Sequence, residues 1–68
     1  MYNYKKHLIS EHAQIKEALL ILNTLASDAI LFVVNKELQL IGSLTDGDVR
    51  RGLLNKLDID DDVTLFVQ

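Results

Sequence analysis

Apolar residues recur at spacings of three and four between Ala13 and Ser27, which predicts an amphipathic helix over this segment. The residues of this stripe are Ile15, Ala18, Leu19, Leu22, Leu25 and Ala26. Leu20 and Ile21 lie off the stripe, so we expect the helix to meet a second apolar surface as well as the core. Its start is the weak end, because glutamine, here Gln14, is a poor N-cap.

Two further segments have the pattern of β-strands. Ala29–Val34 (AILFVV) is a continuous apolar run rich in β-branched residues, which predicts a strand that is central in its sheet and covered on both faces. A polar turn follows at Asn35–Glu37. Leu38–Thr45 alternates in part, and we expect it to pair with the first strand as a hairpin.

The segment Asp46–Leu57 predicts a second helix, with Val49, Leu53 and Leu57 spaced four apart on one face. The order helix, strand, strand, helix indicates an α+β domain whose two helices lie on one face of the sheet. A single pair of layers leaves apolar surface open, so such a unit is expected to associate with a second copy of itself.

Composition strengthens the expectation of a partner. The chain has 68 residues, of which 49% are hydrophobic and 25% charged, as is typical of a folded domain. A domain this short buries only about 60% of the surface that its unfolded chain exposes. It contains no cysteine, so neither a disulfide nor a thiolate metal site is available to stabilise it.

Charge and hydropathy exclude several classes of function. No apolar run approaches the ~20 residues of a membrane helix, and the N-terminal residues lack the apolar core of a signal peptide, so we expect a cytoplasmic protein without a membrane partner. The net charge of −3 disfavours nucleic-acid binding. The sequence nominates no nucleophile with a base beside it, so no catalytic residue is predicted and the chain is not expected to be an enzyme.

The stretch Gly42–Leu54 (GSLTDGDVRRGLL) carries the candidate chemistry. Asp46 and Asp48 stand where carboxylates cap the start of a helix. Capping does not explain Arg50 and Arg51, because positive charge in the first helical turn opposes the helix dipole unless an anion faces it. Either the arginines bind a phosphate, or they pair with nearby carboxylates on a solvated face.

The same junction has the parts of a nucleotide site. Backbone N–H groups at the helix start, the hydroxyl of Thr45 and a close backbone approach at Gly47 are features of phosphate cradles. A carboxylate such as Asp48 can accept two ribose hydroxyls, as acidic residues do in other nucleotide sites.

No metal site is predicted. The acidic run Asp58–Asp62 is spaced like the opening of a calcium loop, but Val63 stands where that loop needs glycine. His7 and His12 lie five residues apart without a third ligand, so both are expected at the surface. The acidic run is predicted to be a solvated connector.

The segment Ile30–Leu54 (ILFVVNKELQLIGSLTDGDVRRGLL) resembles one repeat of the cystathionine-β-synthase (CBS) domain family. The signature of that repeat is an apolar strand, a turn and a second strand ending in glycine, then Thr, two residues, Asp and an apolar residue, here Gly42, Thr45, Asp48 and Val49. HLISEHAQIKEALLIL is similar to its first strand and helix. The resemblance implies a β-α-β-β-α fold over residues 1–57, with residues 58–68 as an acidic connector toward a second repeat.

The resemblance also implies pairing and a ligand. CBS repeats pair through their sheets, here between chains as a homodimer or with a second repeat, and hold AMP, ADP, ATP or S-adenosylmethionine between them. Asp48 would bind the ribose hydroxyls and Thr45 the ribose or phosphate, while Ala29 and Ile30 would border the adenine. The arginines lie outside the signature. Replacing Asp48 with alanine is therefore expected to abolish nucleotide binding and to leave the fold intact.

The version TDGDVRRGLL is similar to the CBS repeats attached to sugar-phosphate nucleotidyltransferases and to those of sugar-phosphate isomerases. KKHLIS so close to Met1 favours the nucleotidyltransferases, in which the module precedes the catalytic domain. The expected function is a regulatory module that binds an adenosyl nucleotide and biases an attached enzyme. A structural dimerisation module with an empty cleft is the alternative. Gln14 in place of a threonine, and NKELQ in place of an Asn-Gly turn, depart from the family pattern.

Overall fold

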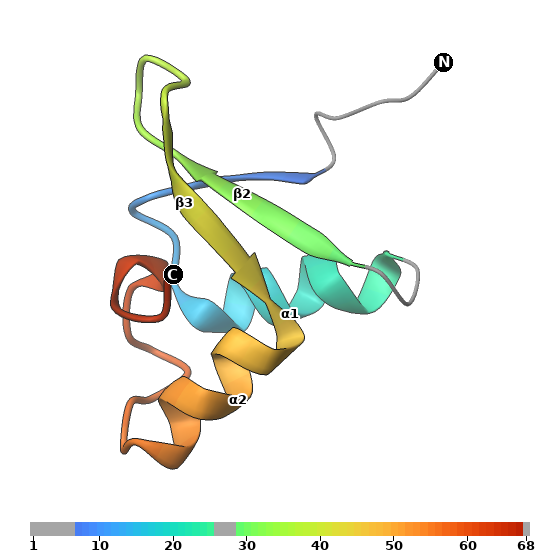
Figure 1. Cartoon of the computed structure of the whole chain (residues 1–68), viewed down its shortest axis with the longest axis vertical. Coiled ribbons are helices and arrows are strands. Elements are labelled where there is room, and N and C mark those ends of the chain that lie inside the picture. Colours follow the sequence, from blue (N-terminus) through green and yellow to red (C-terminus); the bar gives the residue numbers. More distant parts are fainter. Residues whose placement is uncertain (1–6, 26–28, 68) are drawn as a thin grey trace.

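The chain forms a three-stranded sheet, two α-helices and a short 3-10 helix in the order β1-α1-β2-β3-α2-η2 (Figure 1). The structure, a computed structural model, describes residues 7–25 and 29–67. The elements are β1 (Leu8–Ser10), α1 (Ile15–Thr24), β2 (Ile30–Val34), β3 (Leu40–Thr45), α2 (Asp46–Leu54) and η2 (Val63–Leu65). The predicted α+β class and β-α-β-β-α order are confirmed.

The sheet has the strand order β1-β2-β3, with β1 parallel to β2 and β3 antiparallel to it. The predicted hairpin and the central position of β2 are therefore confirmed. Ile30 pairs with Thr45 and Phe32 with Ser43, and the register shifts after Val33. This register fixes which strand residues stand beside the start of α2.

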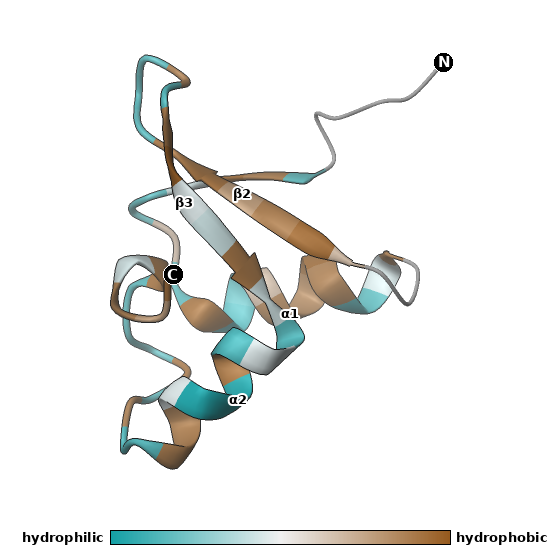
Figure 2. Cartoon of the chain, in the orientation of Figure 1, coloured by the Kyte–Doolittle hydropathy of each residue, from teal (hydrophilic) through white to brown (hydrophobic). Residues whose placement is uncertain are grey.

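The two faces of β2 are covered unequally. Leu31 and Val33 are fully buried in the core that the helices cover. Ile30 and Phe32, which point to the other face because side chains alternate along a strand, are only half-buried. Figure 2 shows that β2 is apolar along its whole length. The strand was predicted to be covered on both faces. Within this chain that is true of the face toward the helices, whereas the other face is only partly covered.

The start of α1 is completed by the acidic segment. Gln14 is the N-cap and makes no side-chain capping bond, which agrees with the predicted weak start. Instead, the N–H groups of Ile15 and Lys16 donate to the carbonyls of Asp61 (3.0 Å) and Ile59 (2.9 Å). Carbonyls distant in sequence thus satisfy donors that a helix leaves unpaired in its first turn.

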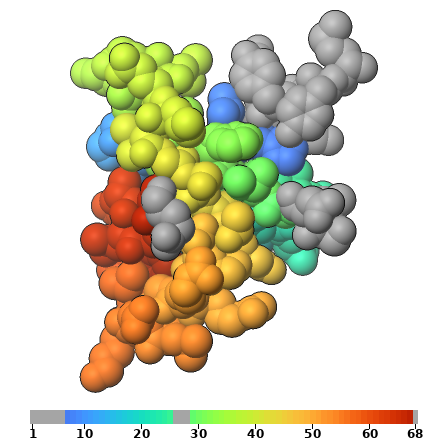
Figure 3. Space-filling model, viewed as in Figure 1, coloured from blue at the N-terminus to red at the C-terminus, as the bar shows by residue number. Residues whose placement is uncertain are grey.

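The segment that follows α2 contributes to the core. Val63 and Phe66 are buried there, and the Val63 N–H donates to the Ala13 carbonyl (2.9 Å). Figure 3 shows this C-terminal segment packed against α2. The boundary after residue 57 stays a prediction, but the residues beyond it complete the same core as the residues before it.

Helix α2 is shorter than predicted and buries a different face. It ends at Leu54 in a Schellman motif, in which the Leu57 N–H donates to the Gly52 carbonyl and the Lys56 N–H to the Leu53 carbonyl. Lys56 takes the left-handed position with φ 73°. The predicted stripe of Val49, Leu53 and Leu57 is wrong for its middle member, because Leu53 is exposed and Gly52 is buried instead.

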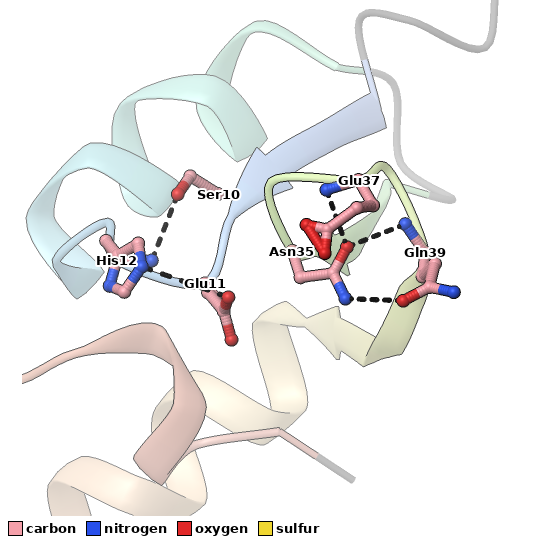
Figure 4. A network of polar contacts seen from close by, with 6 residues as sticks. All are labelled: Ser10, Glu11, His12, Asn35, Glu37 and Gln39. Atoms are coloured by element: carbon pink, nitrogen blue, oxygen red, sulfur yellow. Dashed lines mark hydrogen bonds and ion pairs between the residues drawn. The ribbon is translucent and has the colours of Figure 1, made fainter.

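The hairpin turn is organised by one side chain (Figure 4). The Asn35 Oδ1 accepts the N–H groups of Glu37 (2.9 Å) and Gln39 (3.0 Å), and its Nδ2 donates to Gln39 Oε1 (2.9 Å). Leu38 stands at φ 63° in this turn, in the left-handed region that a glycine usually occupies.

Candidate functional site

A reciprocal capping box joins the end of β3 to α2. The Asp48 N–H donates to Thr45 Oγ1 (3.3 Å), and the Thr45 N–H donates to Asp48 Oδ2 (2.9 Å). The Thr45 hydroxyl also donates to the same Oδ2 atom (3.1 Å). The N-cap is therefore Thr45 and not an aspartate; of the two aspartates predicted to cap the helix, Asp48 takes part in the box as its third helical residue, and Asp46 is the first residue of α2.

The second oxygen of the Asp48 carboxylate is held by Arg51. The Arg51 Nη2 contacts Asp48 Oδ1 from one turn further along α2. The Asp48 side chain is only 4% exposed, whereas that of Arg51 is 61% exposed. Burial of the carboxylate is thus compensated on both oxygens, by the cap on one and by the largely exposed Arg51 cation on the other.

The beginning of β2 lies beside this box. Ile30 is the register partner of Thr45, and Ala29 immediately precedes it. Both residues are half-buried. The four residues that the resemblance assigns to a ligand, namely Ala29, Ile30, Thr45 and Asp48, are therefore neighbours at one end of the sheet.

His7 also belongs to this end of the sheet. Its Nδ1 donates to the carbonyl oxygen of Ile30 (2.8 Å), and its side chain is half-buried. It was expected at the surface, as was His12, which is exposed. No pattern in the sequence signals the contact, because it joins residues 23 positions apart.

The two arginines do not face the same space. Arg51 lines a hollow of about 190 Å³ together with Asp48, Asn55 and Phe66. Arg50 lines a separate groove between α1 and α2, of about 340 Å³. The chain therefore does not bring Arg50 and Arg51 together, and of the two only Arg51 stands beside Asp48.

The acidic run has a local structural role. Asp61 Oδ2 accepts the Asp58 N–H (2.7 Å), and Lys16 Nζ pairs with Asp60 Oδ1 (3.0 Å). Over residues 7–25 and 29–67, no group of three His, Asp or Glu side chains is placed to hold a metal ion. In the same residues, no helix has both the length and the apolar character needed to cross a membrane.

Comparisons with protein-family models, with curated proteins and with solved structures found no match to this chain.

Proposed function

We propose that this chain is a CBS-type regulatory module that binds an adenosyl nucleotide, such as AMP, ADP, ATP or S-adenosylmethionine. The observation that carries the proposal is the register pair Ile30 and Thr45, which sets an apolar strand end beside a helix start with a buried carboxylate. The apolar end suits a purine ring, and Asp48 suits ribose hydroxyls, which are donors.

In the proposed complex the ligand exchanges with Arg51. Oδ2 of Asp48 already has two partners in the cap, so a ribose hydroxyl competes for Oδ1, where Arg51 binds. The ribose hydroxyl then replaces Arg51 as the donor to Oδ1, so the buried carboxylate keeps a partner on both oxygens. The released guanidinium then stands one helical turn from the ribose and is available for a phosphate.

The second half of the binding cleft is proposed to come from another CBS repeat, supplied by a second copy or by an adjoining segment. The half-buried apolar side chains of Ile30 and Phe32 on the open sheet face support this pairing. The attached enzyme is proposed to be a sugar-phosphate nucleotidyltransferase, or else a sugar-phosphate isomerase, on the likeness of TDGDVRRGLL to the repeats of those enzymes.

One observation favours a second candidate, a structural dimerisation module without a ligand. Both Asp48 oxygens have partners inside the chain, so the carboxylate needs no ligand to compensate for its burial. In that case Thr45, Asp48 and Arg51 stabilise α2 and nothing more.

Isothermal titration calorimetry separates the two candidates. The chain is titrated in turn with AMP, ADP, ATP and S-adenosylmethionine, and with GMP as a control for the purine. Saturable binding of at least one adenosyl compound, tighter than that of GMP, supports the regulatory module. Absence of heat for all four adenosyl compounds at millimolar concentration supports the structural module.

A further inference from the structure

The guanidinium of Arg51 folds back over the first turn of α2. It contacts Asp48 Oδ1, and it also covers the backbone of Gly47, because a β-carbon at position 47 would stand 3.5 Å from Nη1 and 3.9 Å from Nη2. The Thr45 hydroxyl oxygen lies 3.7 Å from the same point. In the free chain the cation therefore lies on the part of α2 where the ribose and phosphate of the proposed ligand would bind.

The Asp48 carboxylate alone holds the Arg51 side chain in this position. Within residues 7–25 and 29–67, that side chain makes no ion pair or hydrogen bond with any other group. A positive charge over the first turn of a helix is otherwise unfavourable, because the helix dipole is positive at that end. The Arg51 side chain is 61% exposed, so it can move away without disturbing the core.

A bound ribose would exchange one donor to the Asp48 carboxylate for another, and the exchange is unequal. Arg51 gives the carboxylate a charge-assisted hydrogen bond, whereas a ribose hydroxyl is a neutral donor. The displaced guanidinium also loses its anion. A 5′-phosphate on the ligand supplies a new anion to that guanidinium, but a ligand without a phosphate leaves the loss of the ion pair uncompensated.

We propose that Arg51 is an internal competitor for the ligand, and that this competition makes the site selective for adenosyl ligands with a 5′-phosphate. The inference rests on the proposed nucleotide function and narrows its ligand class. AMP, ADP and ATP displace Arg51 from Asp48 and bind it through their phosphates. Adenosine has no such group, and S-adenosylmethionine carries a positive sulfonium in place of the phosphate, so both compete poorly with the ion pair.

Isothermal titration calorimetry with AMP, adenosine and S-adenosylmethionine tests the exchange. The wild type is expected to bind AMP at least about tenfold more tightly than either of the other two. Arg51→Gln removes the cation and keeps a neutral donor. In this variant we expect adenosine to bind at least about threefold more tightly than in the wild type, and AMP at least about tenfold more weakly. A purely structural role of Arg51 would move both affinities in the same direction.

Two further variants serve as controls. Arg50→Gln removes the same charge from the neighbouring residue, which lines the separate groove between α1 and α2. Its ratio of AMP to adenosine affinity should stay within about twofold of the wild-type ratio, because exposed charges are screened by salt. Arg51→Lys keeps the cation without the planar guanidinium, so it should retain a preference for AMP over adenosine. Far-ultraviolet circular dichroism shows whether each variant is folded.

The possible failures separate the selectivity from the nucleotide function. Equal affinities of the wild type for AMP and adenosine would overturn the role of Arg51 as a competitor. So would an Arg51→Gln variant that keeps the wild-type ratio or loses affinity for both ligands alike; in each of these cases nucleotide binding itself would stand. Absence of binding of all three ligands to the wild type and to every variant would instead contradict the nucleotide function, and the selectivity with it.

Discussion

The ring of Phe66 lies directly on the backbone of Gly52, so close that a β-carbon at position 52 would stand 2.2 Å from the Phe66 Cδ2 atom. Gly52 is therefore required by packing and not by backbone conformation, because no described glycine has a positive φ. The contact joins α2 to the C-terminal segment. Glycine weakens a helix, but at this position it leaves the space that the Phe66 ring occupies in the core.

Gly52→Ala is expected to destabilise the domain by about 1 to 3 kcal/mol, because the cost of overpacking exceeds the gain of about 1 kcal/mol in helix propensity. Gly47→Ala is the matched control in the same helix. Its β-carbon would lie 3.5 Å from the nearest atom, Arg51 Nη1, so it should keep or raise stability. Urea unfolding measures both, and equal stabilities for the two variants would show that the Phe66 contact is not formed.

Phe66→Ala is expected to unfold most of the domain. Phe66 is 3% exposed in the core, and truncating a buried phenylalanine costs about 3 to 5 kcal/mol, close to the whole stability of a small domain. Leu65→Ala, at a neighbouring position that is 58% exposed, should change stability by no more than about 0.5 kcal/mol. Far-ultraviolet circular dichroism with thermal unfolding compares them. A cooperative transition in Phe66→Ala near that of the wild type would mean that the C-terminal segment is dispensable.

Substitutions at Asp48 separate its capping role from its proposed ligand role. Asp48→Ala loses the cap and the Arg51 contact, so it should cost at least about 1 to 2 kcal/mol. A loss of affinity in this variant therefore has to be compared with its loss of stability. Asp48→Glu keeps a capping box, because glutamate is a usual residue at this third helical position.

The glutamate variant is therefore expected to remain within about 1 kcal/mol of the wild type in urea, and to lose at least about tenfold in AMP affinity because its carboxylate is displaced. Calorimetry and unfolding are measured on the same samples. Wild-type AMP affinity in Asp48→Glu would remove Asp48 from the ligand site.

Leu38→Asn is expected to stabilise the hairpin by about 0.5 to 1 kcal/mol. Leu38 is exposed and holds φ 63°, a conformation that costs a leucine about 1 to 2 kcal/mol and an asparagine less. Leu40→Asn, at an exposed position within β3, offers no such gain. The urea midpoints of the two variants are compared. A lower midpoint for Leu38→Asn than for Leu40→Asn would show that the backbone at position 38 is not strained.

Local patterns predicted the elements well where the signal lies within a few residues. The apolar run of β2, the turn after it and the start of α2 at Asp46 are all where the sequence indicates. Contacts between distant segments were beyond such patterns. Two examples are the carbonyls of Ile59 and Asp61, which accept hydrogen bonds from the start of α1, and the ring of Phe66, which packs on Gly52. Both depend on the path of the chain after α2, which no local pattern predicts.

In the candidate site, too, local contacts could be predicted from the sequence, and contacts that depend on the fold could not. Capping by an aspartate was predicted, but the N-cap is Thr45, with Asp48 as its partner in the capping box, and the hairpin register sets Ile30 beside them. The different directions of Arg50 and Arg51 could be anticipated only in part, because neighbours on a helix diverge by about 100°. From the sequence, both were interpreted as one basic pair. In the structure Arg51 binds Asp48, whereas Arg50 lines the groove between α1 and α2.

The most direct test of the proposed function is a two-dimensional ¹H–¹⁵N NMR titration of the chain with AMP. We expect saturable amide shifts concentrated at Ala29, Ile30 and the segment from Thr45 to Arg51, with smaller changes at the hairpin. An unchanged spectrum at millimolar AMP, or shifts confined to residues remote from the Ile30 and Thr45 pair, would contradict it.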